Sequence, residues 1–184
     1  ALSAHRPVQG VVINNRVANV CAPEGRATAE AVLGAVAAAA GIDPELLLAA
    51  STGVIGWRLP AAELCAAAPA LLSGLGAANG VDVASAIMTT DAYPKLRSAH
   101  TAAGHRVVGI AKGAGMIEPC MGTMLAFLLT DAPASRGELQ EILAHSVARS
   151  FNAVTVDGDQ STSDIALLLS SAPAADAVDA DLGG

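Results

Sequence analysis

The chain has 184 residues, of which 53% are hydrophobic and only 2% aromatic, so its core has to be built from Ala, Val, Leu and Ile. Its formal net charge is −7 and its ten Lys and Arg residues are scattered, which excludes a basic stripe for a phosphate backbone, and we expect no nucleic acid partner. The mean hydropathy of +0.50 is high, but no apolar segment reaches the roughly 18 residues of a membrane helix, so we expect no membrane partner.

The three cysteines, Cys21, Cys65 and Cys120, are far apart and form no CxxC pair. This spacing argues against a disulfide framework and against a zinc site. The first residues lack the charged start and apolar stretch of a secretory signal. We therefore expect a reduced, cytoplasmic protein without a metal.

The first half of the chain alternates β-branched runs with alanine-rich segments, which favours strands followed by helices. Thr28 is expected to cap the first helix and Gly41 to end it, and Asp43 to cap a short helical turn. The predicted elements are a strand at 8–12 that 17–21 can continue, a helix at 28–40, a buried apolar segment at 46–51, a helix at about 60–75 and a strand at 83–88.

The second half continues this alternation. We predict a turn at 93–95, a strand at 106–111, a central strand at 123–130, an amphipathic helix at 135–150, a strand or turn at 151–157 and a helix at 165–169. Ser163-Asp164 is expected to cap that last helix. A low-complexity tail begins at Ala172, and no linker precedes it, so a single α/β or α+β domain with helices layered around a sheet is the simplest arrangement.

Gly122-Thr123 opens the apolar run of the central strand and has the chemistry of a self-cleaving bond. A threonine hydroxyl becomes a strong nucleophile when its own free α-amino group accepts the proton. That amine has a reference pKa of about 7.7–8.0 and is released by cutting the bond before Thr123. Gly122 permits the close approach that this reaction requires. The alternative is a glycine at the start of an ordinary strand.

Four segments, in order along the chain, resemble segments of the ornithine acetyltransferase family. They are Ser51-Thr-Gly-Val-Ile-Gly56, Ile87-Met-Thr-Thr-Asp91 with Pro94-Lys95, Lys112 to Ala132 with its Gly-Ala-Gly-Met-Ile sequence, and Ser150 to Asp164. The resemblance covers about Val11 to Ser170. Cys120 and Gly122 stand where the family commonly has Asn and Ala.

The resemblance implies a role for each matching position. Thr123 matches the nucleophile that takes the acetyl group, after autocatalytic cleavage between Gly122 and Thr123. Thr52 and Gly53 match the oxyanion-hole pair, and Thr89 and Lys112 match positions that, with Thr123, hold the amino-acid substrate. The implied reaction moves an acetyl group from N-acetylornithine to glutamate through an acyl-threonine, releases ornithine, needs no cofactor, and belongs to arginine biosynthesis.

Cleavage at this position divides the chain into 1–122, the start of a second product at 123–171, and the tail at 172–184. The resemblance implies that the two products stay together in a heterotetramer. The family chain is longer than this one, and its acidic catalytic helper would lie beyond residue 184. A threonine amidohydrolase, in which water takes the acyl group, and a truncated non-catalytic subunit therefore remain alternatives.

Each candidate residue also has a structural explanation. Thr52 and Gly53 can form a loop and helix cap, Lys112 can be a solvated charge at a strand end, and Thr89 can cap a turn with Asp91. The Asp157-Gly-Asp-Gln-Ser-Thr-Ser-Asp164 segment imitates the first ligands of a calcium loop, but Thr162 and Leu168 replace its required glycine and glutamate, which favours a polar turn.

Overall fold

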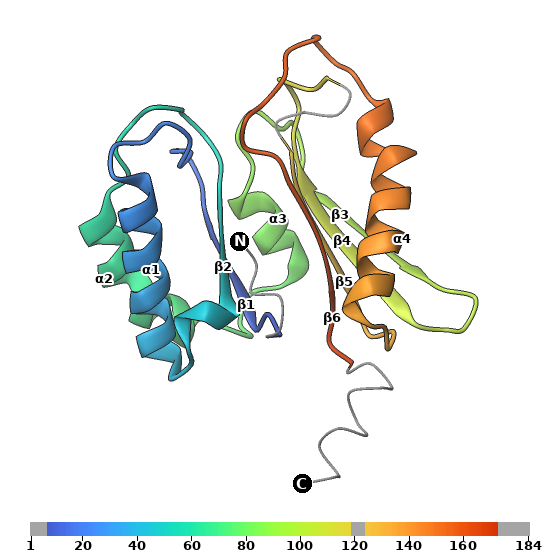
Figure 1. Ribbon diagram of the computed structural model, residues 1–184, viewed down its shortest axis with the longest axis horizontal. Helices are drawn as coiled ribbons and strands as arrows, with labels where there is room; N and C mark the ends of the chain where they lie inside the picture. Colours follow the sequence, from blue (N-terminus) through green and yellow to red (C-terminus); the bar gives the residue numbers. More distant parts are fainter. Residues whose placement is uncertain (1–6, 119–123, 173–184) are drawn as a thin grey trace, which may run out of the picture. The chain divides into compact units, whose positions relative to one another are not determined.

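The computed structural model describes residues 7–118 and 124–172. The chain forms two compact units, residues 1–89 and 90–184 (Figure 1). The predicted mixed α/β class is confirmed, but the expectation of one domain is not, because contacts concentrate within each unit. The division at 122 and 171 depends on the cleavage position and stays a prediction. No helix of the described segments is long and apolar enough to cross a membrane.

The first unit is built on a parallel strand pair joined by a helix. Strand β1 (Gly10–Asn14) pairs with β2 (Leu47–Ser51), and α1 (Gly25–Ala40) connects them through the 3-10 turn η1 (Pro44–Leu46). Helix α2 (Ala61–Ser73) packs along α1, as Figure 1 shows. Small side chains make this close packing feasible, since Val36, Ala37, Leu47 and Ala68 form the buried cluster at its centre.

Several details of the first unit differ from prediction. Helix α1 begins three residues earlier than expected: Glu24, in the left-handed region at φ 57°, is its N-cap, and Thr28 is buried inside the helix. Residues 17–21 contribute only a single bridge, from Val17 to Val54, instead of a continued strand. Gly41 ends α1 and Asp43 caps η1 as predicted.

The predicted strand at 83–88 is wrong, because the chain forms helix α3 (Gly80–Ala86) there. The Asn79 side chain accepts the backbone N–H groups of Val81 and Asp82, and the Asp82 carboxylate accepts the N–H of Asn79 in return. This capping box satisfies the first turn of the helix and outweighs the alternating Val pattern that suggested a strand.

The second unit is a four-stranded sheet in the order β3-β4-β5-β6, covered on one face by helix α4 (Figure 1). Its elements are β3 (Lys95–His100), β4 (Arg106–Lys112), β5 (Leu125–Thr130), α4 (Arg136–Ala148), the 3-10 turn η2 (Phe151–Ala153) and β6 (Ile165–Ser170). All pairings are antiparallel except β5 with β6, which α4 connects. Each unit therefore contains a parallel pair joined by a helix.

One prediction for the second unit is wrong and another is right only in part. The segment 165–169 is strand β6 and not a helix, because its apolar run completes the sheet beside β5. Residues 151–157, predicted as a strand or a turn into one, form a 3-10 turn followed by a loop, so the turn is confirmed and the strand is not. Strand β3 was not predicted at all, since its mostly exposed, charged sequence gives no hydrophobic signal, as is common for an edge strand.

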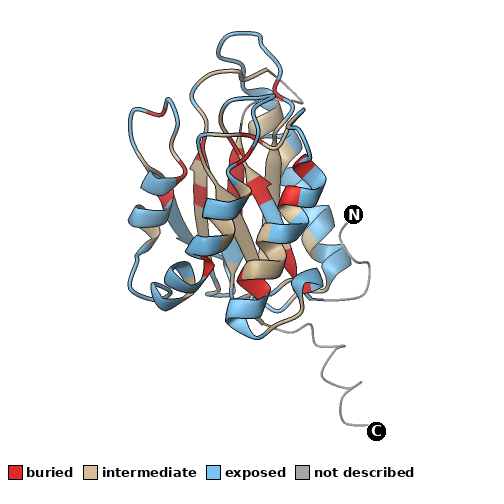
Figure 2. Ribbon diagram, turned by 90° about the vertical axis from the view of Figure 1, so that its left-hand side faces the viewer, coloured by how far each residue is buried: buried red, intermediate tan, exposed pale blue. Residues whose placement is uncertain are grey.

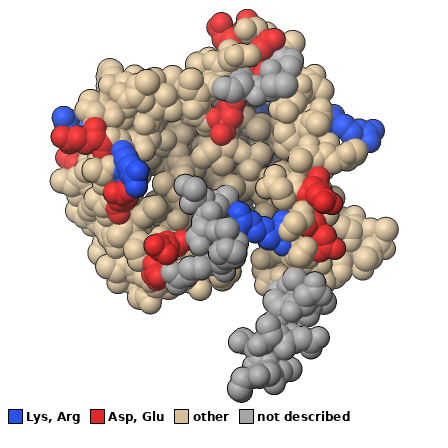
Figure 3. Space-filling model, in the orientation of Figure 1, with Lys and Arg blue, Asp and Glu red and all other residues tan. Residues whose placement is uncertain are grey.

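Burial follows this layered arrangement. In Figure 2 the strands carry many of the buried and intermediate residues, whereas the outer faces of the helices are exposed. On the face shown in Figure 3, Lys and Arg occur as separate spots beside Asp and Glu, which agrees with the scattered charges of the sequence.

Gly53 follows β2 at a point where the backbone is crossed closely by another loop. Its φ is 129°, and a Cβ atom there would lie 2.1 Å from the carbonyl carbon of Arg16. Gly56 has φ 81° but no atom within 4 Å of the same position. A side chain at Gly53 would therefore meet both a steric overlap and an unfavourable backbone conformation, whereas a side chain at Gly56 would meet only the unfavourable conformation.

We expect Gly53→Ala to lower the free energy of unfolding by more than about 3 kcal/mol, because backbone has to move. The matched Gly56→Ala variant should cost only about 1 kcal/mol, the cost of a left-handed residue with a side chain. Urea unfolding of both variants checks this, and equal losses would contradict the close approach.

Candidate functional site

A buried lysine ends strand β4. The Lys112 residue is only 1% exposed and lies opposite Leu125 of β5 in the sheet register. Burial lowers the pKa of Lys112, and the charges of Asp91 and Asp164 oppose this shift. The alternative of a solvated charge at a strand end is therefore wrong.

Asp91 is the first of two carboxylates near this lysine. Its side chain is fully buried, and Oδ1 accepts the backbone N–H of Gly113 at 2.8 Å. The same oxygen pairs with the ammonium group of Lys95. Asp91 therefore connects the turn before β3 with the residue that follows Lys112.

Asp164 is the second carboxylate, and it stands directly before β6. Its Oδ1 accepts the backbone N–H of Met124 at 2.8 Å, while Oδ2 is buried and has no hydrogen-bond partner among the described residues. Burial raises the pKa of Asp164, whereas the Met124 N–H, the Ser161 hydroxyl and the charge of Lys112 act in the opposite direction. Asp164 does not cap a helix, because it binds a residue forty positions earlier.

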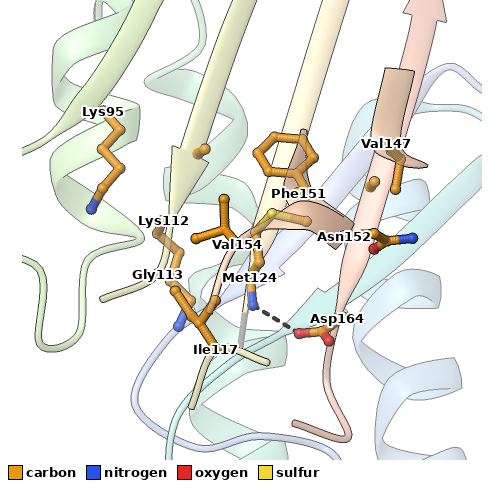
Figure 4. A pocket seen from close by; sticks show the side chains of 12 residues that line it. Lys95, Lys112, Gly113, Ile117, Met124, Val147, Phe151, Asn152, Val154 and Asp164 are labelled. Atoms are coloured by element: carbon orange, nitrogen blue, oxygen red, sulfur yellow. Dashed lines mark hydrogen bonds between the residues drawn. The ribbon is translucent and has the colours of Figure 1, made fainter. Parts of the chain in front are cut away.

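Lys112 and Asp164, together with the Lys95 partner of Asp91, line a cavity of about 280 Å³ in the second unit. Ala111, Lys112, Met124 and Ala166 come from the sheet side, and Val147, Phe151 and Asn152 come from the end of α4 and from η2. Figure 4 shows the polar side chains of Lys112 and Asp164 at the lower end in this view and Phe151 and Val147 above them. A charged end and an apolar wall suit a small ligand that carries a carboxylate.

Thr52 and Gly53 lie in the first unit, in the loop after β2. Thr52 is 1% exposed and its N–H donates to the carbonyl of Asn14 at 3.1 Å. Within the part of the chain that the structure describes, its buried hydroxyl has no hydrogen-bond partner. No helix begins there, because the next helix, α2, starts at Ala61 with Pro60 as its N-cap. The two residues lie in a loop, as that alternative expected, but they do not cap a helix. A buried hydroxyl without a described partner is uncommon in folded proteins.

The other predicted residues are placed as follows. Thr89 is exposed in the bend between α3 and β3, at the end of the first unit. Gly122 and Thr123 lie outside the described residues, as do Cys120 and the tail beyond Ala172. The structure therefore brings Lys112 together with the start of β5, and it describes Thr52, Gly53 and Thr89 within the other unit.

Three aspartates that sequence reasoning did not assign to the site have defined roles. Asp91 and Asp164 contact residues beside Lys112, and Asp157 accepts the N–H groups of Met116 and Ile117. All three lie in segments that resemble the family, Ile87 to Asp91 and Ser150 to Asp164, which is the signal that could have found them. Within the described ranges, no group of three or more His, Cys, Asp or Glu side chains could hold a metal ion.

The family is decided by comparison with known proteins. The model of the ArgJ family matches residues 1–182. The chain belongs to the ArgJ family. The resemblance to ornithine acetyltransferases predicted from the four sequence segments is thereby confirmed.

Individual relatives support this family assignment. The chain is 42% identical over 174 residues to the arginine biosynthesis bifunctional protein ArgJ of Geobacter sulfurreducens, covering 92% of this chain and 44% of that protein. It is 46% identical over 166 residues to the protein of the same name from Symbiobacterium thermophilum, covering 88% of this chain and 41% of that protein. This ArgJ-family chain thus spans less than half the length of the curated relatives it matches.

A solved structure supports the fold. The crystal structure of ornithine acetyltransferase from Mycobacterium tuberculosis, complexed with ornithine, is 38% identical with a TM-score of 0.55. The match covers 59% of this chain and 61% of that one. The mixed α/β fold is therefore shared over this part.

The burial of Lys112 predicts a pH dependence of stability. Because the folded state lowers the pKa of Lys112 from its ordinary 10.5, the unfolded chain binds this proton more tightly, and stability should rise with pH between the two pKa values. In urea unfolding at a series of alkaline pH values, this rise should be present in the parent and absent from Lys112→Met. A Lys95→Met variant keeps Lys112 and should retain the rise; identical curves for all three proteins would refute the assignment.

Proposed function

We propose that this chain carries the nucleophile and part of the substrate site of a self-processing acetyltransferase, which moves an acetyl group from N-acetylornithine to glutamate. Membership of the ArgJ family supports this, as do relatives named as bifunctional arginine biosynthesis proteins. The similar Mycobacterium tuberculosis enzyme is an ornithine acetyltransferase that was crystallised with ornithine.

Processing comes first in this proposal. The hydroxyl of Thr123 attacks the carbonyl carbon of Gly122, the peptide C–N bond breaks, and the hydroxyl proton passes to the released amine. Water then hydrolyses the resulting ester, which restores the hydroxyl and leaves Gly122 with a carboxylate. The freed α-amine of Thr123 is the general base for the next reaction.

Acetyl transfer uses the same hydroxyl. It attacks the acetyl carbonyl of N-acetylornithine, the amide C–N bond breaks, and ornithine leaves with the proton. The glutamate amine then attacks the acyl-threonine ester, forms N-acetylglutamate and returns the hydroxyl to Thr123. The Thr52 hydroxyl and the Gly53 N–H would stabilise the oxyanion of each tetrahedral intermediate, with about 3–4 kcal/mol for each donor.

The observation that carries the proposal is the position of Lys112. This buried cation lines a cavity that also includes Met124, and Met124 directly follows Thr123 in the chain. An ammonium in such a place can bind a substrate carboxylate as a point charge. We assign Lys112 to the substrate, and Thr89 to the same task on the basis of the family resemblance.

The two products should remain associated. Six residues of β4, Val107 to Lys112, pair with Leu125 to Thr130 of β5 across the predicted cut. Separating the products would break this central pairing and expose the apolar residues of the sheet. A heterotetramer made of two such pairs, acting in the cytoplasm, completes the proposal.

Processing is tested by mass spectrometry of the denatured protein. We expect two fragments, of which one begins at Thr123, in the parent and in Thr123→Ser, because serine keeps a hydroxyl nucleophile. Thr123→Ala should remain one chain. A parent that stays intact through long incubation would refute processing, and a cut Thr123→Ala would assign the cleavage to another agent.

Acetyl transfer has a separate test. Exposure of the processed protein to N-acetylornithine should add one acetyl group to the fragment that begins at Thr123, and glutamate should remove it as N-acetylglutamate. Lys112→Met should weaken this labelling at low substrate concentration. Release of free acetate in place of N-acetylglutamate would indicate an amidohydrolase, and absence of any adduct would indicate a non-catalytic subunit.

A further inference from the structure

One loop of the second unit contacts the chain on both sides of the predicted cleavage position. Residues 154–159 of this loop bind residues 116–118, which precede the cut. Asp164, at the end of the same loop, binds Met124, which follows the cut. The loop therefore binds described residues on both sides of the predicted cut.

The contact before the cut centres on Asp157. Its Oδ2 accepts the N–H of Met116 at 2.7 Å, and its Oδ1 accepts the N–H of Ile117 at 3.0 Å. A third N–H, from Asp159, reaches Oδ1 at 3.3 Å. These donors, led by Met116, lower the pKa of Asp157, so the carboxylate is charged at neutral pH.

The backbone at this point needs such a contact. Met116 has a φ of 52°, in the left-handed region that a residue with a side chain rarely adopts. Two charge-assisted hydrogen bonds to consecutive N–H groups select this conformation. Neighbouring bonds extend the contact, since Val156 N–H donates to the carbonyl of Ile117 at 2.8 Å and the Thr155 hydroxyl donates to Glu118 at 2.8 Å.

The contact after the cut is of the same kind. Asp164 accepts the N–H of Met124, and the N–H of Ile165 donates to the carbonyl of Met124 at 3.0 Å. Met124 is thus held on both its N–H and its carbonyl side. In general, fixing backbone on both sides of a reacting bond reduces the conformations that have to be searched before its groups meet.

We propose that Asp157 is a positioning residue for self-cleavage, which holds the backbone of Met116 and Ile117 so that the bond before Thr123 is presented to its nucleophile. This inference rests on the processing step proposed above. The described contacts of the Asp157 side chain are all with backbone N–H groups, so we assign it a positioning role. The Asp157 carboxylate, which resembled a calcium ligand in the sequence, is here an acceptor for backbone N–H groups.

The test compares Asp157→Asn with Asp159→Asn. Both changes remove one negative charge from the same loop, but only Asp157 binds Met116 and Ile117 through its side chain; the described contact of Asp159 uses its backbone N–H. Cleavage is followed after cell-free synthesis by mass spectrometry of the intact chain and of both fragments. Asp157→Asn should cleave on the order of tenfold to a hundredfold more slowly, and Asp159→Asn within about twofold of the parent rate.

A second measurement separates positioning from folding. In a Thr123→Ala background, which should stay uncut, amide NMR spectra of Asp157→Asn should show shifts concentrated at Met116 and Ile117 and faster hydrogen exchange there. The thermal unfolding midpoint should stay close to that of Thr123→Ala alone. Local change in a folded chain supports positioning, whereas global unfolding in this background would overturn it.

The outcomes also distinguish this inference from the proposed function. If the parent is cut and Asp157→Asn is cut at the same rate, the role of Asp157 is refuted while processing stands. If Asp159→Asn is slowed as much as Asp157→Asn, loop charge and not the backbone contact is responsible, which also refutes the role. A parent that is never cut refutes the processing step and this inference with it.

Discussion

The second unit depends on the burial of one positive charge. An ammonium group removed from water needs opposite charges nearby. Lys112 is 1% exposed, and the negative charges of Asp91 and Asp164 stabilise its charged form. Both carboxylates also accept backbone N–H groups, from Gly113 and from Met124. The same electrostatic requirement therefore fixes the chain beside the lysine and the start of β5. A site built this way combines charge with rigid backbone, which suits the binding of a charged substrate.

Short polar loops carry much of this arrangement. The loop 154–164 contains no helix or strand, yet its aspartates bind backbone on each side of the predicted cut. Carboxylates accept several N–H groups at once, so a few residues can hold two separate segments. The backbone pairing of β4 with β5 also connects the chain before the predicted cut with the chain after it. The proposed processing and the proposed association of its products would thus depend on different interactions.

Much of the secondary structure was predictable where local and tertiary preferences agree. The helices α1, α2 and α4 and the strands β1, β4 and β5 were expected close to their observed positions. The strand β6 was missed because Ser163-Asp164 before an apolar run is the usual start of a helix, while here Asp164 binds Met124 and the run joins a sheet. Helix α3 was missed for the opposite reason, since its alternating pattern favours a strand and its capping box favours a helix.

The sequence by itself determined the mixed α/β class, the ArgJ family and the candidate residues Thr52, Gly53, Thr89, Lys112 and Thr123, because ordered motifs and the chemistry of a threonine nucleophile are local properties. Only the tertiary structure decided that Lys112 is buried, that Gly53 lies against Arg16, and that Asp157 and Asp164 bind the backbone of Ile117 and Met124. The partners of these residues are supplied by strands and loops up to some forty positions away. Burial and hydrogen bonding over such separations arise only when the chain has folded, because no local pattern encodes which distant backbone group a side chain will meet.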